Sequence, residues 1–372
     1  MQLSLFAWEQ RKAKELFVST ADKGYPELPV LSATQNRGMI RRDENSINIF
    51  HDKKNEAGYK RVLPGQFVIH LRSFQGGFAH SAIEGITSPA YTVFGFSEPE
   101  KHDSEYWKYV FTSKSFIRRL ETVTYGIRDG RSISYDEFLT LGFAYPSKAE
   151  QTAIAQYLDK LSDLITLHQR KYNKLLNVKK SMLEKMFPKN GSNIPEIRFK
   201  GFTDPWEQRK LGDIVGIYDG VHQTPNYQNS GVMFLSVENI ATLKSSKFIS
   251  EEDFKRDYKV FPQENDILMT RIGDVGTTNV VTDNGLKAYY VSLALLKYKS
   301  IDPYFLSNAI QSDYVQKGLA NRTLKTAIPM KINKDEIGKV SVMLPLSATE
   351  QQQIGTYFRN LDSLITLHQR EF

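Results

Sequence analysis

The sequence predicts a mixed α+β protein that contains two similar domains and a pair of long helices. The first observation is a duplication of the whole chain: AWEQRK at 7–12 returns as PWEQRK at 205–210, and LITLHQR at 164–170 returns at 364–370. The second is a helix-start signal followed by the same apolar heptad in each copy, and the third is a set of short strand-like runs in between. A repeat of about 200 residues is far longer than a solenoid unit, so we expect two copies of one fold in pseudo-two-fold arrangement.

The residues between the repeated ends differ almost completely. Runs of β-branched and aromatic residues predict strands at 67–71, 91–96, 232–237, 266–272 and 289–298. Each copy also contains a candidate short helix, near Glu105–Leu120 and near Pro303–Leu319. A shared frame around different interiors indicates two modules that hold the same partners and recognise two different things.

Both copies contain the same helix-start signal. Ser147 and Glu150 have the Ser-x-x-Glu spacing of a capping box, and Ser347 and Glu350 repeat it. In this box the serine accepts a hydrogen bond from the third helical N–H, while the glutamate reaches back to the N–H of the cap residue. We therefore expect long helices to begin at these two serines, the first of them running to Phe187 before Pro188.

An apolar heptad follows each helix start and predicts that the two helices pair antiparallel. The first helix would be about 55–60 Å long at 1.5 Å per residue, and such a helix needs a partner in water. An ordinary amphipathic core helix remains the alternative, and we interpret the two histidines of the heptad as pairing residues, with no metal-ligand role. The residues expected to pair the helices are Ile154, Leu161, Leu164, His168, Leu175, Ile354, Leu361, Leu364 and His368.

Composition limits the class of protein. The formal net charge is +7, of which +2 falls in residues 1–150, +5 in 151–190 and 0 in 191–372. A basic total suggests a polyanionic partner, although the interiors are nearly neutral. The chain contains no cysteine, and neither a signal peptide nor a long apolar span is evident. We expect a soluble cytoplasmic protein without disulfides and without a membrane partner.

No catalytic motif is present in the sequence. There is no phosphate-binding GxxxxGK[ST] loop, no HExxH, no Cys/His cluster, no GxSxG elbow and no glycine-rich dinucleotide fingerprint. We therefore expect a chain with no catalytic residue, no metal site and no cofactor of its own.

The interiors do contain the side chains that read base edges. Arginine binds guanine bidentately, asparagine and glutamine bind adenine, and serine and threonine are adaptable. Loop-like stretches dense in such groups occur at similar places in both copies, which favours recognition over ordinary solvated loops. The candidate DNA-binding residues are Gln35, Asn36, Arg37, Arg41, Arg72, Gln75, Arg128, Arg131, His222, Gln223, Thr224, Arg271, Asp274, Thr277, Thr278, Asn279, Arg322, Lys325 and Lys331.

The whole pattern resembles the specificity (S) subunits of type I restriction–modification systems. The resemblance is carried by WEQRKLGDI at 206–214, DILMTRIGDVG at 266–276, the repeated LITLHQR and the duplicated layout. It implies two target-recognition domains that each read one part of a split, asymmetric site in double-stranded DNA. It also implies two modification subunits, which dock on the helices, carry S-adenosylmethionine and methylate adenine. Restriction subunits would add an ATP- and magnesium-dependent nuclease, and the helix pair would act as a ruler between the two readers.

The resemblance also assigns domain boundaries. The second long helix stops at Phe372, which corresponds to Tyr172, whereas the first copy continues to Phe187, so the second helix is expected to be truncated. A stand-alone or inactive, recombined or truncated sequence-specific DNA-binding protein is the alternative reading. The expected regions are target-recognition domain 1 at 1–146, the central helix at 147–187, a linker at 188–204, target-recognition domain 2 at 205–344 and the distal helix at 345–372.

Overall fold

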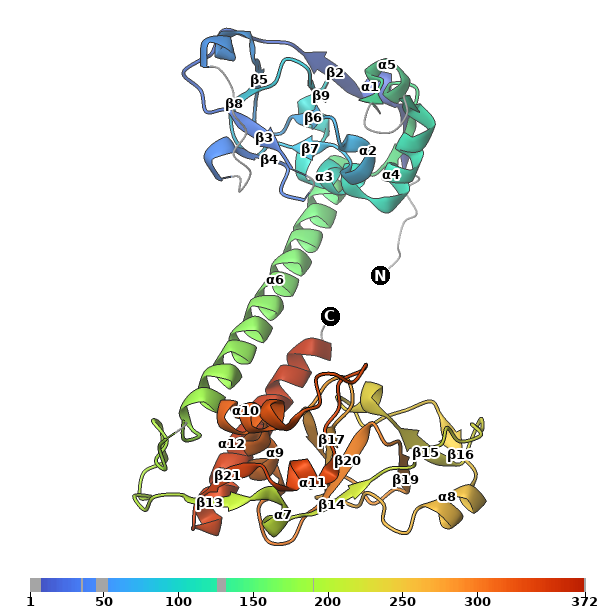
Figure 1. Cartoon of the computed structure of the whole chain (residues 1–372). Helices are drawn as coiled ribbons and strands as arrows, with labels where there is room; N and C mark the ends of the chain where they lie inside the picture. Colours follow the sequence, from blue (N-terminus) through green and yellow to red (C-terminus); the bar gives the residue numbers. More distant parts are fainter. Residues whose placement is uncertain (1–7, 35, 45–52, 126–131, 190, 371–372) are drawn as a thin grey trace, which may run out of the picture. The chain divides into compact units, whose positions relative to one another are not determined.

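The computed structural model describes residues 8–34, 36–44, 53–125, 132–189 and 191–370 (Figure 1). The chain divides into two compact units, Met1–Leu164 and Ile165–Phe372. Both units mix helices with mainly antiparallel sheets, so the predicted fold class is confirmed. Within the described ranges, no helix combines the length and the apolar character needed to cross a membrane.

In the first unit, the first and the last strand pair with each other. Strand β1 pairs antiparallel with β12, and the central sheet has the strand order β2-β9-β6-β7. The elements of this unit are β1 (Glu9–Lys12), α1 (Ala13–Leu16), β2 (Phe17–Thr20), β3 (Leu31–Ala33), β4 (Met39–Arg41), β5 (Lys60–Val62), β6 (Phe67–Ile69), α2 (Ser73–Gly76), β7 (Ala79–His80), β8 (Gly85–Thr87), β9 (Thr92–Phe96), α3 (Ser104–Thr112), α4 (Lys114–Leu120), β10 (Thr124–Tyr125), β11 (Ser132–Ile133), α5 (Tyr135–Phe138), β12 (Gly142–Tyr145) and the start of α6 (Lys148–Lys185).

The second unit repeats this plan with other residues. Strand β13 pairs antiparallel with β21, and the central sheet has the order β14-β20-β17-β18. Beside the rest of α6, its elements are β13 (Glu207–Lys210), α7 (Leu211–Ile214), β14 (Gly216–Asp219), β15 (Val232–Leu235), β16 (Phe248–Ile249), α8 (Glu251–Asp257), β17 (Ile267–Thr270), β18 (Thr278–Val280), β19 (Lys287–Tyr289), β20 (Leu293–Lys297), α9 (Pro303–Gln311), α10 (Asp313–Arg322), α11 (Lys334–Gly338), β21 (Ser341–Leu344) and α12 (Ala348–Arg370).

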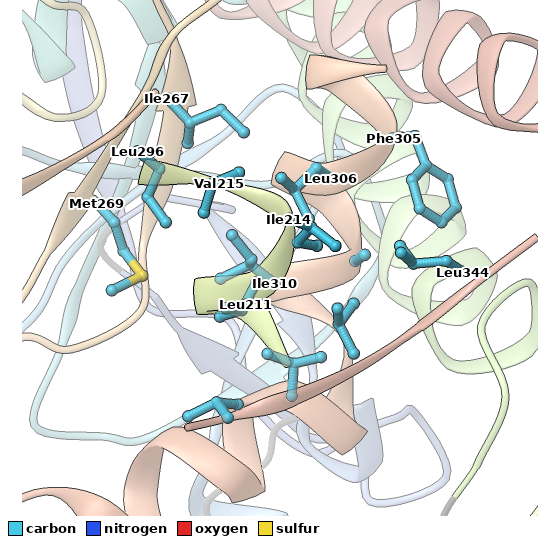
Figure 2. Packing of buried hydrophobic residues seen from close by; sticks show 14 of the residues in the cluster. Leu211, Ile214, Val215, Ile267, Met269, Leu296, Phe305, Leu306, Ile310 and Leu344 are labelled. Carbon is cyan, nitrogen blue, oxygen red and sulfur yellow. The ribbon is translucent and has the colours of Figure 1, made fainter. Parts of the chain in front are cut away.

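The two units fill their cores with different side chains. In the first unit, Phe17, Phe67, Phe94, Trp107 and Phe111 are all buried in one cluster of packed rings. The main core of the second unit is mostly aliphatic. Figure 2 shows Leu211 and Ile214 of α7, with Val215 directly after it, between two strands and a helix. The strands carry Ile267, Met269 and Leu296, and the helix carries Phe305, Leu306 and Ile310. The same frame therefore accepts two chemically different cores.

The predicted strands are present in the structure, but the two predicted short helices are each divided into two. All five predicted strand runs contain a strand, in β6, β9, β15, β17 and β20. Each predicted short helix is instead two helices, because Ser113 and Ser312 have extended backbone angles and separate α3 from α4 and α9 from α10. A serine in this conformation starts a new helix instead of continuing the old one.

The long helices are attached to their own domains by the same glutamine in both copies. The Oε1 atom of Gln151 accepts from the backbone N–H of Asp103 (3.0 Å), and its Nε2 donates to the carbonyl of Pro146 (2.8 Å). Gln351 makes the equivalent bonds to Asp302 N–H (3.2 Å) and to the carbonyl of Pro345 (3.0 Å). Both glutamines are buried. Asp103 and Asp302 also cap helices α3 and α9, so each glutamine ties a long helix to the start of a domain helix.

The predicted capping box is only half right. Ser147 and Ser347 do accept from the N–H groups of Glu150 and Glu350, both at 3.4 Å. The carboxylate of Glu350, however, is 1% exposed and pairs with Arg198 through two bonds of 2.6 and 2.9 Å. It also accepts from the indole N–H of Trp206 (3.4 Å). A buried carboxylate is costly unless it is paired with a positive charge, so Glu350 binds Arg198 and does not cap its own helix. The pair links the second long helix to the chain segment that precedes the second domain.

In the second unit, α12 packs antiparallel on the distal part of α6. The Nδ1 atoms of His168 and His368 are 3.2 Å apart, and Lys179 donates to Asp362 (2.6 Å) further along the pair. At the far end Phe187 packs on Phe358, with ring centroids 5.9 Å apart. The contact between the two histidines is consistent with the pairing role predicted for them. Leu361 is buried and Leu175 is half-buried, as a pairing stripe requires.

The stripe is not covered along its whole length, which corrects part of the prediction. Leu161, Leu164 and Leu364 are 39%, 49% and 46% exposed. Ile154 packs into the core of the first domain, whereas Ile354 lies in the cluster of the second unit that also contains Met186 and Phe187.

Candidate nucleic-acid interface

Three loops of the second domain meet where strands β14 and β17 end. The first loop follows Asp219, the second follows Thr270, and the third is a short hairpin between α10 and α11. Arg271 joins them. Its Nη1 bonds to the carboxylate of Asp219, and its Nε donates to the carbonyl of Ile332 (3.1 Å). The guanidinium group thus links Asp219, where the first loop begins, to Ile332, where the third loop ends.

The position of Arg271 corrects the prediction that it contacts a base. The residue is 5% exposed, and its Nε and Nη1 groups bond to Ile332 and Asp219 of the protein itself. Burial lowers the pKa of Arg271, but an arginine remains protonated at neutral pH, so Asp219 balances a real charge. Arg271 is a positioning residue for the loops and is not available to bind DNA directly.

The loop after Asp219 exposes the predicted residues His222, Gln223 and Thr224. They line an open cavity of about 640 Å³, which Arg256 and Tyr258 from the region of α8 also line. The backbone of the loop is fixed, since Val221 N–H donates to the carbonyl of Tyr289 (3.2 Å) and Val291 N–H donates to that of Val221 (3.0 Å). Amide, imidazole and hydroxyl groups on a fixed loop have the chemistry that base-edge recognition requires.

The hairpin between α10 and α11 exposes Lys325 and Lys331. Its neighbour Arg322 is also exposed, but it pairs with Glu336 (3.0 Å). The two lysines are therefore better placed than Arg322 to meet phosphate groups, which are the usual targets of lysine on DNA.

The stretch 274–279 is partly used for internal contacts, which corrects the predictions for Thr278 and Asn279. Thr278 is buried and donates to the carbonyl of Ser307 (2.9 Å), and the amide of Asn279 donates to the carbonyl of Ile240 (2.9 Å). Asp274 accepts from the hydroxyl of Thr270 (3.1 Å). Thr277 is exposed at its side chain, while its backbone closes the turn with Thr270. Thr278 and Asn279 therefore shape the loop, while the side chains of Asp274 and Thr277 stay exposed.

In the first domain the predicted residues lie on two turns. Thr34 accepts from Arg37 N–H (3.0 Å) and donates to the carbonyl of Gly38 (2.8 Å), which leaves Asn36 and Arg37 exposed at the tip. Gly38 has φ +65°, and a Cβ there would collide with the carbonyl of His80, so this tight turn needs glycine. Arg41 is exposed and next to Asp43 (3.3 Å).

The second turn of the first domain follows strand β6. Arg72, directly before helix α2, and Gln75, on that helix, are exposed. Beside them His70 is half-buried; its partial removal from water and the nearby Arg72 charge lower the pKa of His70 to about 4. His70 is therefore neutral at pH 7, and Arg72 is the charged side chain that this turn exposes. The predicted residues Gln35, Arg128 and Arg131 lie outside the described residues.

The sequence missed the contribution of α8. The segment Glu251–Asp257 resembles an ordinary capped surface helix, and Arg256 pairs with Asp253 (2.7 Å) and Asp257 (2.8 Å). Only the three-dimensional structure brings it opposite His222. Among the described residues, no group of three or more His, Asp or Glu side chains could hold a metal ion.

Comparison with known proteins agrees with this architecture. Residues 203–371 match the model of the type I restriction modification DNA specificity domain. A curated relative, the type I restriction enzyme MjaVIII specificity subunit of Methanocaldococcus jannaschii, is 22% identical over 63% of this chain. The chain spans 58% of the length of that relative.

Solved structures show the same fold. The HsdS subunit from Thermoanaerobacter tengcongensis matches with a TM-score of 0.51 and 16% identity over 98% of this chain and 91% of its own. The S subunit of a type I restriction–modification system from M. genitalium matches with a TM-score of 0.57 and 15% identity over 100% of this chain and 94% of its own. The predicted resemblance is confirmed, since residues 203–371 match the type I restriction modification DNA specificity domain.

Proposed function

We propose that this chain is the DNA-sequence specificity subunit of a type I restriction–modification complex. Each domain would read one part of a split, asymmetric site in double-stranded DNA. The observation that carries the proposal is the set of loops which Arg271 holds at one end of the second domain, inside the stretch that matches the specificity-domain model. The first domain presents Arg37 and Arg72 on turns of its own.

The proposal includes partner subunits that perform the chemistry. Two modification subunits would dock on the long helices and methylate adenine with S-adenosylmethionine, and restriction subunits would add the ATP- and magnesium-dependent nuclease. Exposed apolar residues on these helices support a docking role, among them Ile165, Leu167, Leu364 and Leu367, which are 46–53% exposed. Helices that are polar on their outer face would not support it.

The test is the methylation pattern of a host genome. The chain is expressed with a modification subunit in a host that lacks both, and methylated adenines are mapped by long-read sequencing. We expect one bipartite motif with an unread spacer. The double variant Gln223→Ala, Thr224→Ala should relax the half of the motif that the second domain reads and leave the other half unchanged, because a good base contact contributes about 1–3 kcal/mol of discrimination.

Other results would favour another function. A continuous motif, or relaxation of both halves by the double variant, would contradict one reader per domain. DNA binding by the chain without methylation, together with failure to co-purify with any modification subunit, would favour a stand-alone DNA-binding protein. Methyl transfer by the purified chain alone would contradict a non-catalytic subunit.

A further inference from the structure

The hairpin between α10 and α11 carries an apolar tip. The N–H of Leu324 donates to the carbonyl of Lys331 (2.8 Å), which closes the hairpin. Between them Ile328 is 100% exposed, Met330 is 47% exposed, and Leu324 itself is 46% exposed. A single exposed apolar side chain is common on a protein surface, but three on one short hairpin form a small apolar surface that favours a binding partner.

The base of this hairpin is fixed to the domain. Gly273 N–H donates to the carbonyl of Met330 (2.8 Å), and Ile332 N–H donates to the carbonyl of Arg271 (3.0 Å). The side chain of Ile332 is completely buried. Because Arg271 also bonds to Ile332 and to Asp219, the hairpin leaves the core at the same point as the loop that carries His222. The tip is therefore held outward on the proposed reading surface.

The charge around the tip fits a polyanion. Residues 323–331 contain Lys325 and Lys331 and no acidic residue, and both lysines are exposed. Ile328, Pro329 and Met330 are of the residue types that DNA-bending proteins insert between neighbouring base pairs. An apolar tip between two lysines fits a hairpin that inserts between base pairs while the lysines contact the phosphates on either side. A surface that binds another protein would not require these lysines.

We infer that the hairpin 324–331 is a DNA wedge, which inserts Ile328, supported by Met330, between two base pairs of the half-site read by the second domain. Lys325 and Lys331 contact the flanking phosphates. This inference rests on the proposed function. It adds a reading mode that depends on how easily a base step unstacks, because such deformation differs between sequences even where no base edge is touched.

The test uses the full chain with its modification subunits. Duplexes are first selected from a random pool, and 2-aminopurine is then placed at each position of the enriched half-site, since its fluorescence rises when it is unstacked. We expect binding to raise the fluorescence several-fold at one step. Ile328→Ala should abolish this rise and weaken specific binding about tenfold, while Ile328→Leu should retain both. Tyr298→Ala is the matched control, because Tyr298 is 47% exposed at the opposite end of β20.

The lysines give an independent readout. The variant Lys325→Gln, Lys331→Gln should keep the fluorescence rise at saturating protein but reduce the slope of log affinity against log salt by about 2, close to 0.9 per phosphate contact. Enrichment of a motif without any fluorescence rise, or an unchanged rise in Ile328→Ala, would overturn the wedge and leave the proposed function standing. Loss of modification-subunit binding in Ile328→Ala with normal DNA binding would assign the tip to protein contact and also overturn it. A pool with no enriched sequence would overturn the proposed function itself.

Discussion

The two domains use an arginine at the same point of the repeated fold in opposite ways. Arg72 and Arg271 both follow the third strand of the four-stranded sheet, yet Arg72 is exposed and Arg271 is 5% exposed. The first strand of each sheet explains the difference. In the second domain β14 ends in Asp219, which neutralises a buried guanidinium, whereas in the first domain β2 ends in Thr20. A buried charge requires a counter-charge, so the same residue type is structural in one copy and presented to solvent in the other.

The largest expected effect is the difference in stability loss when each of these two arginines is replaced by alanine. Arg271→Ala should destabilise the second domain by about 3–5 kcal/mol, because it removes one partner of a buried pair and leaves Asp219 without its cation. Arg72→Ala should change the stability of the first domain by less than about 0.5 kcal/mol. Urea unfolding measures both, with Trp107 reporting on the first core and Trp206 on the second.

Single-reporter backgrounds make this measurement clean. Trp107→Phe and Trp206→Phe each leave one buried indole, and the exposed Trp8 is common to both. Equal stability losses for the two arginine variants would contradict the assignment of Arg271 as a positioning residue.

A second pair tests the two helix starts. Glu350→Gln should destabilise the second domain by about 2–3 kcal/mol, because its carboxylate is buried against Arg198 and a charged hydrogen bond is lost. Glu150→Gln at the exposed equivalent position should have an effect below about 0.5 kcal/mol. The same unfolding experiment at pH 7 measures both, and a similar loss at Glu150 would mean that the capping interaction, not the ion pair, is the important one.

The smallest expected effect is a difference in acid sensitivity. Burial lowers the pKa of His70, His80 and His102, all in the first domain, and that of His70 falls to about 4. The unfolded chain binds these protons near pH 6.5, so the stability that neutral histidines provide is complete above pH 6.5 and is lost as the pH falls toward 4. By linkage His70 alone should cost the first domain about 1 kcal/mol between pH 7 and pH 5.5, and His80 and His102 act in the same direction. In the second domain burial raises the pKa of Asp302, which acts in the opposite direction.

Unfolding at several pH values, read from Trp107 and Trp206 separately, measures this difference. Arg72→Ala is the control, because the Arg72 charge contributes to the low pKa of His70, and its removal should make the acid sensitivity of the first domain weaker. A second domain that loses stability first on acidification would contradict the interpretation.

The sequence predicted the frame of the molecule better than its surfaces. Repeats, strand runs and helix starts are local patterns, and they appear in the structure where they were expected. The role of Arg271 depends on Asp219, which is 52 positions away and pairs with it only because β14 and β17 both lie beside β20. The burial of Thr278 likewise depends on contact with Ser307 of α9. No residue pattern along the chain distinguishes a buried arginine from an exposed one when the neutralising carboxylate comes from another strand.

The apolar heptad illustrates a different limit. Its period of seven predicted a paired helix, and the contacts of His168 with His368 and of Lys179 with Asp362 agree. The period does not state how much of the stripe one partner helix covers, and Leu161 and Leu164 remain exposed. Periodicity defines a face, whereas coverage depends on where the partner begins and ends.

The repeated glutamine attachment has an evolutionary consequence. Gln151 and Gln351 each bind a backbone N–H at the start of a domain helix, and Asp103 and Asp302 provide that start. Contacts to backbone groups do not depend on the side chains of the interior. An interior inherited from another gene would therefore fit the same long helix if it supplied one aspartate-capped helix at this place. New binding preferences could then arise by exchanging whole interiors in a single recombination event, without any compensating change in the helices.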